Sequence, residues 1–211
     1  ANTIVAGSGM TGTLTATEVV DGTVTGTAAT IMSVTGTESV IVNAGADTTN
    51  ITTSGFTSQV VNAGTAATIG VRDAGVATDT TTLNVNADAT ITNGLTGAMT
   101  LDLTDGNSVT MNVIGASLDV TGAGDVTINS TGLTAETATN SKTDGTLTYA
   151  STVTTAQNVS NIAADNFTFS GAVTAALTFS DNDNVTLSGN VNGADLTIGG
   201  TATDDVLNVE V

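Results

Sequence analysis

The sequence predicts an all-β fold, and three observations carry that prediction. Apolar residues alternate with polar ones in short runs, as in strands that bury one face. Gly, Asn and Asp occupy the gaps between the runs, where turns need conformations that other residues resist. The chain contains no Pro, so every residue of a central strand keeps its N–H for pairing.

The alternation places the expected strands one after another along the chain. In Thr100–Thr104, for example, Leu101 and Leu103 share one face of the strand and Asp102 lies on the other. Two segments without this pattern, Ala135–Asn140 and Thr154–Asn158, are each compatible with a single helical turn. The expected strands are Ser39–Asn43, Asn50–Thr53, Gln59–Asn62, Thr81–Asn86, Ala89–Thr92, Thr100–Thr104, Val109–Val113, Leu118–Thr121, Val126–Asn129, Asn166–Ser170, Leu177–Ser180, Val185–Ser188, Leu196–Ile198 and Leu207–Val209. The terminal segments Asn2–Val5 and Val206–Val211 are also strand-like.

Two all-β architectures are compatible with these strands. A β-solenoid stacks short strands into coils with a thin core, and Thr, Val, Ile and Asn suit its rows of like residues. An antiparallel β-sandwich needs large side chains to fill about 10 Å between its sheets, and aromatic residues make up only 2% of this chain. We therefore favour a β-solenoid-like stack, with one or two antiparallel sandwich domains as the alternative, although the sequence shows no strict repeat.

The alternation of apolar and polar residues suggests a division of the chain into regions. We expect β-rich regions over residues 1–130 and 156–211. Residues 131–155 break the alternation, and we expect an irregular loop or a seam there. One continuous domain over residues 1–211 is the alternative organisation.

The charge of the chain excludes several classes of partner. Twenty acidic residues against two basic ones, Arg72 and Lys142, give a formal net charge of −18. Nucleic acids and anionic lipid surfaces are bound through Lys and Arg, so neither is an expected partner. The sequence also lacks a run of about 20 apolar residues, and we expect no membrane insertion.

The side chains that usually perform catalysis are missing. The chain has no His, Cys or Trp, so Ser and Thr hydroxyls lack the adjacent base that a nucleophile needs. A pair of carboxylates is the remaining catalytic option, but glycosidase sites usually also need aromatic walls. We therefore expect that the protein is not an enzyme.

Clustered acids indicate calcium binding instead. Ca²⁺ takes six to eight oxygen ligands from carboxylates, amides and carbonyls. Asp181 and Asp183 alternate within Ser180–Asn184, so their side chains point the same way in an extended turn. The other candidate pairs are Asp204 with Asp205, and Asp102 with Asp105 at a strand end. The simpler alternative is that these Asp residues only form turns.

Two segments carry a resemblance to known families. Gly199–Leu207 resembles a degenerate nonapeptide of the RTX proteins secreted by the type I route, with Ala202 in place of the third Gly. Ser33–Asn43 resembles a recurring element of bacterial surface-layer (S-layer) proteins, whose composition rich in Thr, Ala, Gly, Asn and Val is similar to that of this chain. The resemblance implies secretion, a self-assembling lattice and Ca²⁺-dependent contacts.

These observations together predict an extracellular structural protein at the cell surface. We expect it to assemble with copies of itself into a layer or fibre, assisted by Ca²⁺. At least one of the strand-like segments Asn2–Val5 and Val206–Val211 is expected to pair with a neighbouring copy. The alternative is an adhesin that binds a partner such as a cell-surface glycan, with Phe167, Phe169 and Phe179 as the nearest approach to an aromatic cluster.

Overall fold

A computed structural model describes residues 2–104, 106–112 and 118–128, together with the strands that follow. Every described element is a β-strand, and the chain divides into unit 1 (residues 1–102) and unit 2 (residues 103–211). Within the described residues we find no helix whose length and hydropathy would suit a bilayer crossing. The strands of unit 1 are β1 (Asn2–Ala6), β2 (Thr13–Gly26), β3 (Ile31–Ala44), β4 (Asn50–Phe56), β5 (Ser58–Asn62), β6 (Thr68–Asp73), β7 (Thr80–Val85), β8 (Ala89–Gly94) and β9 (Ala98–Leu103), which ends at the boundary. Those of unit 2 are β10 (Ser108–Asn112), β11 (Leu118–Gly122), β12 (Asp125–Ile128), β13 (Ala138–Lys142), β14 (Thr146–Tyr149), β15 (Gln157–Ser160), β16 (Asn166–Phe169), β17 (Leu177–Ser180), β18 (Asn184–Leu187), β19 (Leu196–Gly199) and β20 (Val206–Val209).

The strands stack as the coils of a parallel β-solenoid, which confirms the favoured fold class. Each strand pairs in parallel with the strand one coil further along, as Thr13 does with Ile31 and Ser58 with Thr80. Side chains that hydrogen-bond to each other between successive coils are 18, 19 or 22 residues apart. This varying coil length explains why the sequence shows no strict repeat.

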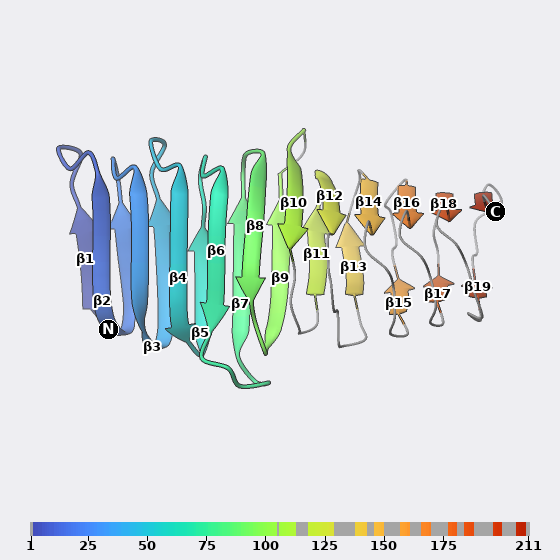
Figure 1. Cartoon of the computed structure of the whole chain (residues 1–211), viewed down its shortest axis with the longest axis horizontal. Coiled ribbons are helices and arrows are strands. Elements are labelled where there is room, and N and C mark those ends of the chain that lie inside the picture. The colour runs from blue at the N-terminus through green and yellow to red at the C-terminus, as the bar shows by residue number, and fades with distance from the viewer. Residues whose placement is uncertain are drawn as a thin grey trace. The chain divides into compact units, whose positions relative to one another are not determined.

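Unit 1 contains two sheets, one on each side of the coil (Figure 1). We call the sheet made by the N-terminal halves of β2 and β3 with β4, β6 and β8 the first sheet. The second sheet consists of β1, the C-terminal halves of β2 and β3, β5 and β7, with β9 beyond β7. The strands β2 and β3 run through the corner between the sheets, and later coils use two separate strands.

The core of unit 1 lies between the two sheets and consists of aligned apolar rows. Strand alternation turns every second side chain inward, and parallel register places like residues above one another. The row from the first sheet and the row from the second sheet are both fully buried: Met32, Ile51, Ile69 and Ile91, and Val24, Val42, Val61 and Leu83. Branched aliphatic residues therefore fill this thin core without the aromatic residues that a sandwich requires.

Unit 2 has the same parallel arrangement in its described strands. One series runs from β10 through β12, β14, β16 and β18 to β20. The other series contains β11 paired with β13, and β15, β17 and β19 paired in order. The strands β13 and β14 fall within residues 131–155, where the sequence suggested a loop or seam.

Several sequence-based expectations are corrected by these strands. The antiparallel sandwich alternative is wrong, because the strand pairings with a defined register are parallel. The helical turns expected at Ala135–Asn140 and Thr154–Asn158 are wrong where the structure describes them, since residues 138–140 belong to β13 and 157–158 to β15. Pairing to neighbouring coils overrides the weak helical preference of these Ala-containing segments.

Candidate functional site

Three exposed acidic side chains of unit 1 lie at one corner of the coil. Glu18, Asp21 and Glu38 lie where the first-sheet halves of β2 and β3 turn into the second-sheet halves, and we call these three residues the acidic corner. Their φ angles are 57°, 50° and 61°, in the left-handed region. A residue with a Cβ pays roughly 1–2 kcal/mol for this conformation, so the corner holds its carboxylates under local backbone strain.

The next coils use glycine and buried acids at the same corner. Gly55, with a φ of 92°, follows Gly36 there. Asp73 is buried, and its Oδ2 accepts hydrogen bonds from the backbone N–H groups of Thr96 at 2.6 Å and Gly97 at 2.7 Å. Its Oδ1 accepts one from the N–H of Gly75 at 3.0 Å. The carboxylate of Asp73 therefore fastens the corner between coils and is not exposed to a ligand.

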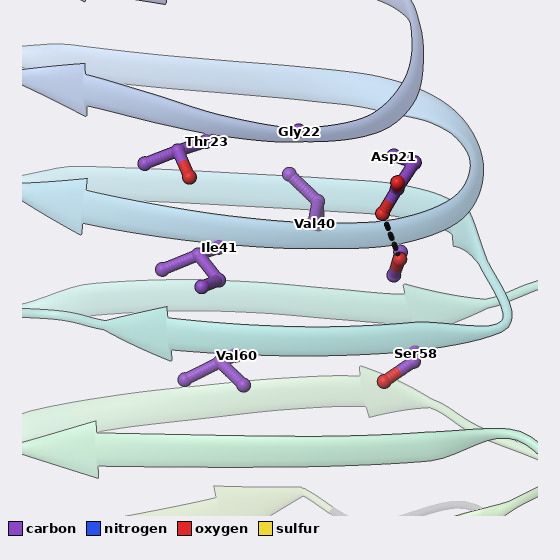
Figure 2. A pocket seen from close by; sticks show the side chains of 8 residues that line it. Asp21, Gly22, Thr23, Val40, Ile41, Ser58 and Val60 are labelled. Atoms are coloured by element: carbon purple, nitrogen blue, oxygen red, sulfur yellow. Dashed lines mark hydrogen bonds between the residues drawn. The ribbon is translucent and has the colours of Figure 1, made fainter. Parts of the chain in front are cut away.

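A shallow groove of about 350 Å³ opens on the outer face of the second sheet, beside the acidic corner. Figure 2 shows that Thr23, Ile41 and Val60 come from successive coils and lie in one row along it. Asp21 and Ser58 lie at the corner end of the groove in the same view. The groove thus has an apolar wall and a polar end.

The polar end of the groove is built around Asp21. Its Oδ1 accepts a hydrogen bond of 2.5 Å from the Oγ of Ser39 in the next coil (Figure 2). Among the described residues, the second carboxylate oxygen has no hydrogen-bond partner. Gly22, which also lines the groove, allows β1 to approach closely, because a Cβ there would stand 2.5 Å from the backbone oxygen of Asn2. A carboxylate, two hydroxyls and an apolar wall suit a cationic or hydroxylated group with a short apolar stem.

The outer face of the first sheet has the opposite character. Its outward positions in the described strands carry no Asp or Glu, and Arg72 is their single charged residue. The Arg72 side chain runs across Gly94, since a Cβ on Gly94 would lie 3.4 Å from Nε. Within the described residues Arg72 forms no ion pair. The outward positions are Thr13, Thr15, Thr17, Ile31, Ser33, Thr35, Asn50, Thr52, Ser54, Thr68, Gly70, Arg72, Thr90, Thr92 and Gly94.

The structure describes only one of the six predicted calcium ligands. Asp102 is an exposed residue of β9, as its strand alternation predicted. Its intended partner Asp105, and the pairs Asp181 with Asp183 and Asp204 with Asp205, lie outside the described residues. In the part of the chain that the structure describes, no three acidic residues come together as a metal site needs. Asp102 on its own does not fit a site that requires six to eight oxygens.

The sequence did not predict the groove or the first-sheet face without carboxylates. From the sequence, Arg72 is only one of two basic residues, and Asp21 is not a predicted site residue. A signal for Asp21 existed, because Asp-Gly at positions 21–22 often marks a sharp turn between two runs with alternating polarity. No pattern along the chain places Asp21, Ser39 and Ser58 side by side without knowledge of the coil length.

Comparisons with known proteins add no family. No protein-family model, no curated protein and no solved structure matches the chain.

Proposed function

We propose that this chain is an extracellular structural protein that assembles with copies of itself into a fibre or layer at the cell surface. The single observation that carries the proposal is the strand β1 at one end of unit 1 (Figure 1). It pairs in parallel with β2, from Asn2 with Gly22 to Ala6 with Gly26. Within the described part of unit 1, the pairing of β1 with a defined register is with β2, and the second edge of such a strand is where a further strand can add through backbone N–H and C=O groups.

The edge of β1 lacks the features that usually prevent strand addition. Natural monomers protect such edges with Lys, Pro or bulges, whereas β1 has the sequence Asn-Thr-Ile-Val-Ala and an unbroken register with β2. Val5, the fourth residue of β1, is 63% exposed, the highest value among the large exposed apolar residues described. A coil from a second copy can add here with the same parallel pairing that joins the coils within the chain.

Side-chain rows along the stack support the same mode of growth. Asn84 Nδ2 donates to Asn62 Oδ1, and Asn62 Nδ2 donates to Asn43 Oδ1, both at 2.7 Å. Asn43 Nδ2 in turn donates to Thr25 Oγ1 at 3.3 Å. We call this the amide ladder. Asn43 and Asn62 each donate one hydrogen bond and accept one, so the ladder joins successive coils of this chain in the parallel register that the proposed growth would use. The same row ends at β1 with Val5, which pairs with Thr25.

We propose that Ca²⁺ promotes this assembly. Copies that each carry a formal charge of −18 repel one another. Divalent cations screen this repulsion and bridge carboxylates of neighbouring copies. The predicted ligands Asp102, Asp105, Asp181, Asp183, Asp204 and Asp205 remain the candidates for such bridges.

Negative-stain electron microscopy of the purified 211-residue chain tests the proposal. We expect ordered fibres or layers with millimolar CaCl₂, and dispersal after excess EGTA is added. Particles that stay monomeric at high concentration with calcium present would overturn the proposal of self-assembly. Assemblies that are indifferent to EGTA would remove calcium from it and leave self-assembly standing.

Blocking the edge of β1 tests the observation that carries the proposal. Val5→Lys places a charge on the edge strand, and we expect it to raise the protein concentration needed for assembly at least about tenfold, as a loss of about 1.4 kcal/mol would. Val76→Lys is the matched control, because Val76 is 52% exposed on the loop between β6 and β7. Equal assembly of the two variants by sedimentation would show that the β1 edge is not used.

The alternative function, an adhesin, is favoured by one observation, the groove beside Asp21. Hydroxyl and carboxylate groups beside an apolar wall are also found in sites for glycans, although no aromatic ring lines this groove. A structural protein orders in pure solution, whereas an adhesin stays dispersed until its ligand is added. The same micrographs therefore separate the two functions.

A further inference from the structure

We infer that the groove on the second sheet of one copy receives Arg72 from the first sheet of another copy. This contact deepens the proposed function and rests on it, because it joins neighbouring stacks side by side. The partner is thus a second copy of this chain, bound through a face and a groove that both belong to unit 1.

The distribution of charge favours a second copy at the first sheet. A chain with a net charge of −18 repels its copies over most surfaces. The outer face of the first sheet is the exception, since its outward positions in the described strands carry no Asp or Glu and one Arg. Its side chains are mostly Thr, Ser, Asn and Gly, which allow a flat sheet to approach another at about 10 Å.

Arg72 is available for such a contact. It is exposed near the end of β6, and no described residue forms an ion pair with it. The neighbouring positions of its row are Ser54 and Gly94, which are too small to cover the guanidinium. A guanidinium on a flat face without a carboxylate partner is suited to a carboxylate on another molecule.

The groove offers the complementary group. The Oδ1 of Asp21 is held by Ser39 at 2.5 Å, which fixes the carboxylate in one orientation. Its second oxygen remains for an N–H donor of the guanidinium. The apolar wall formed by Ile41, which is 43% exposed, and Val60 suits the methylene stem of an arginine.

The position of both partners makes the contact repeatable. Arg72 lies where a first-sheet strand ends, and Asp21 lies where a second-sheet strand begins, at the same corner of the coil. The two sheets form opposite sides of unit 1 (Figure 1), so each copy presents one Arg72 face and one groove. Such a heterologous contact does not close on itself when it proceeds by translation, and it yields an open array.

Charge exchange between two variants tests the contact. Arg72→Asp and Asp21→Arg should each lose side-by-side association, with about a tenfold or greater rise in the concentration needed for layers. An equimolar mixture should restore it. In the mixture, the intact Asp21 groove of the Arg72→Asp variant receives the intact Arg72 of the Asp21→Arg variant. At the next contact, the aspartate at position 72 of one variant faces the arginine at position 21 of the other, so this ion pair also forms, with the two charges exchanged. Layers are scored by electron microscopy and sedimentation of the full chain in calcium.

Matched variants control for net charge and folding. Lys142→Asp and Asp47→Arg change the charge by the same amounts, and Asp47 is an exposed turn residue before β4; we expect both to assemble as wild type. Asp21→Asn suits the left-handed backbone at this position and should also weaken layers if Asp21→Arg folds poorly by circular dichroism. A mixture that fails to restore layers, or single variants that form them normally, overturns the contact.

The outcomes separate this inference from the proposed function. Single fibres that persist in Arg72→Asp while layers disappear support both, because stacking through β1 does not use Arg72. Fibres and layers that are unaffected by either variant overturn only the Arg72 contact. A wild-type chain that never associates overturns both.

Discussion

At the scale of single residues, a few glycines decide whether successive coils can approach one another. A Cβ on Gly36 would collide with the backbone oxygen of Val19 and stand 2.8 Å from Cε1 of the buried Phe56 ring. Gly70 differs, because the nearest atoms to a Cβ there are 3.8 Å away. Close packing therefore requires glycine at position 36, whereas position 70 has room for a Cβ.

Gly36→Ala and Gly70→Ala form a matched pair of substitutions. We expect Gly36→Ala to lower the free energy of unfolding by about 1–3 kcal/mol, because an overpacked site must shift its backbone. Gly70→Ala should be neutral or raise the free energy by up to about 1 kcal/mol, because it restricts the unfolded chain without a clash. Urea denaturation measures both, and equal midpoints would contradict the packing at the corner.

At the scale of elements, polar rows join the strands both outside and inside the coil. The amide ladder runs along the outer side of the second sheet. Inside the core, Thr53 Oγ1 donates to Gln59 Oε1 at 2.6 Å, and Gln59 Nε2 donates to Thr81 Oγ1 at 2.9 Å. Because Thr53 belongs to the first sheet and Gln59 to the second, this buried row also ties the two sheets together.

The amide ladder is expected to stabilise the stack measurably. Asn62→Ala removes one donated and one accepted hydrogen bond, and it should lower the free energy of unfolding by about 1–3 kcal/mol. Asn50→Ala is the control, since Asn50 is half-buried but its side chain forms no hydrogen bond among the described residues. Equal urea midpoints of the two variants would contradict a stabilising role for the amide ladder.

At the scale of the whole molecule, the acidic charge opposes both folding and assembly. Glu18, Asp21 and Glu38 are exposed at the same corner of two successive coils. Like charges at such spacing repel, and added salt weakens the repulsion once the Debye length falls from about 30 Å at 0.01 M to about 8 Å at 0.15 M.

The thermal midpoint of the chain is therefore expected to rise with NaCl between about 0.01 and 0.15 M. CaCl₂ at matched ionic strength should raise it further if calcium bridges carboxylates in addition to screening them. Differential scanning calorimetry at low protein concentration measures the effect on the unassembled chain. A midpoint that is independent of NaCl would show that the acidic residues are already too well separated to matter.

Much of the fold was predictable from alternation alone, but not all of its strands. The expected strand Gln59–Asn62 lies inside β5, and Ala89–Thr92 lies inside β8. The strand β2 was missed because its register shifts between Ala16 and Val19 and again between Val20 and Gly22, which breaks the alternation. The strand β6 was not predicted, because Gly70 and Arg72, which flank its buried residues Ile69 and Val71, are not typical strand residues.

The candidate site was far less predictable than the fold. Asp21, Ser39 and Ser58 come from three coils, and only pairings such as Ser39 with Ser58 bring them together. Coil lengths that vary between 17 and 22 residues hide this alignment from any search for a fixed repeat. The surface without acidic residues is equally hidden, because its positions are distributed over five strands.

The sequence by itself determined that the protein is built of short β-strands, strongly acidic and almost without basic side chains, because alternation and charge are properties of residues close together in the chain. Only the tertiary structure decided that the strands are parallel, that Glu18, Asp21 and Glu38 lie at one corner, and that Arg72 stands alone on a face without carboxylates. The reason is that side chains one coil apart become neighbours through backbone pairing, and the length of each coil is set by its turns and bulges.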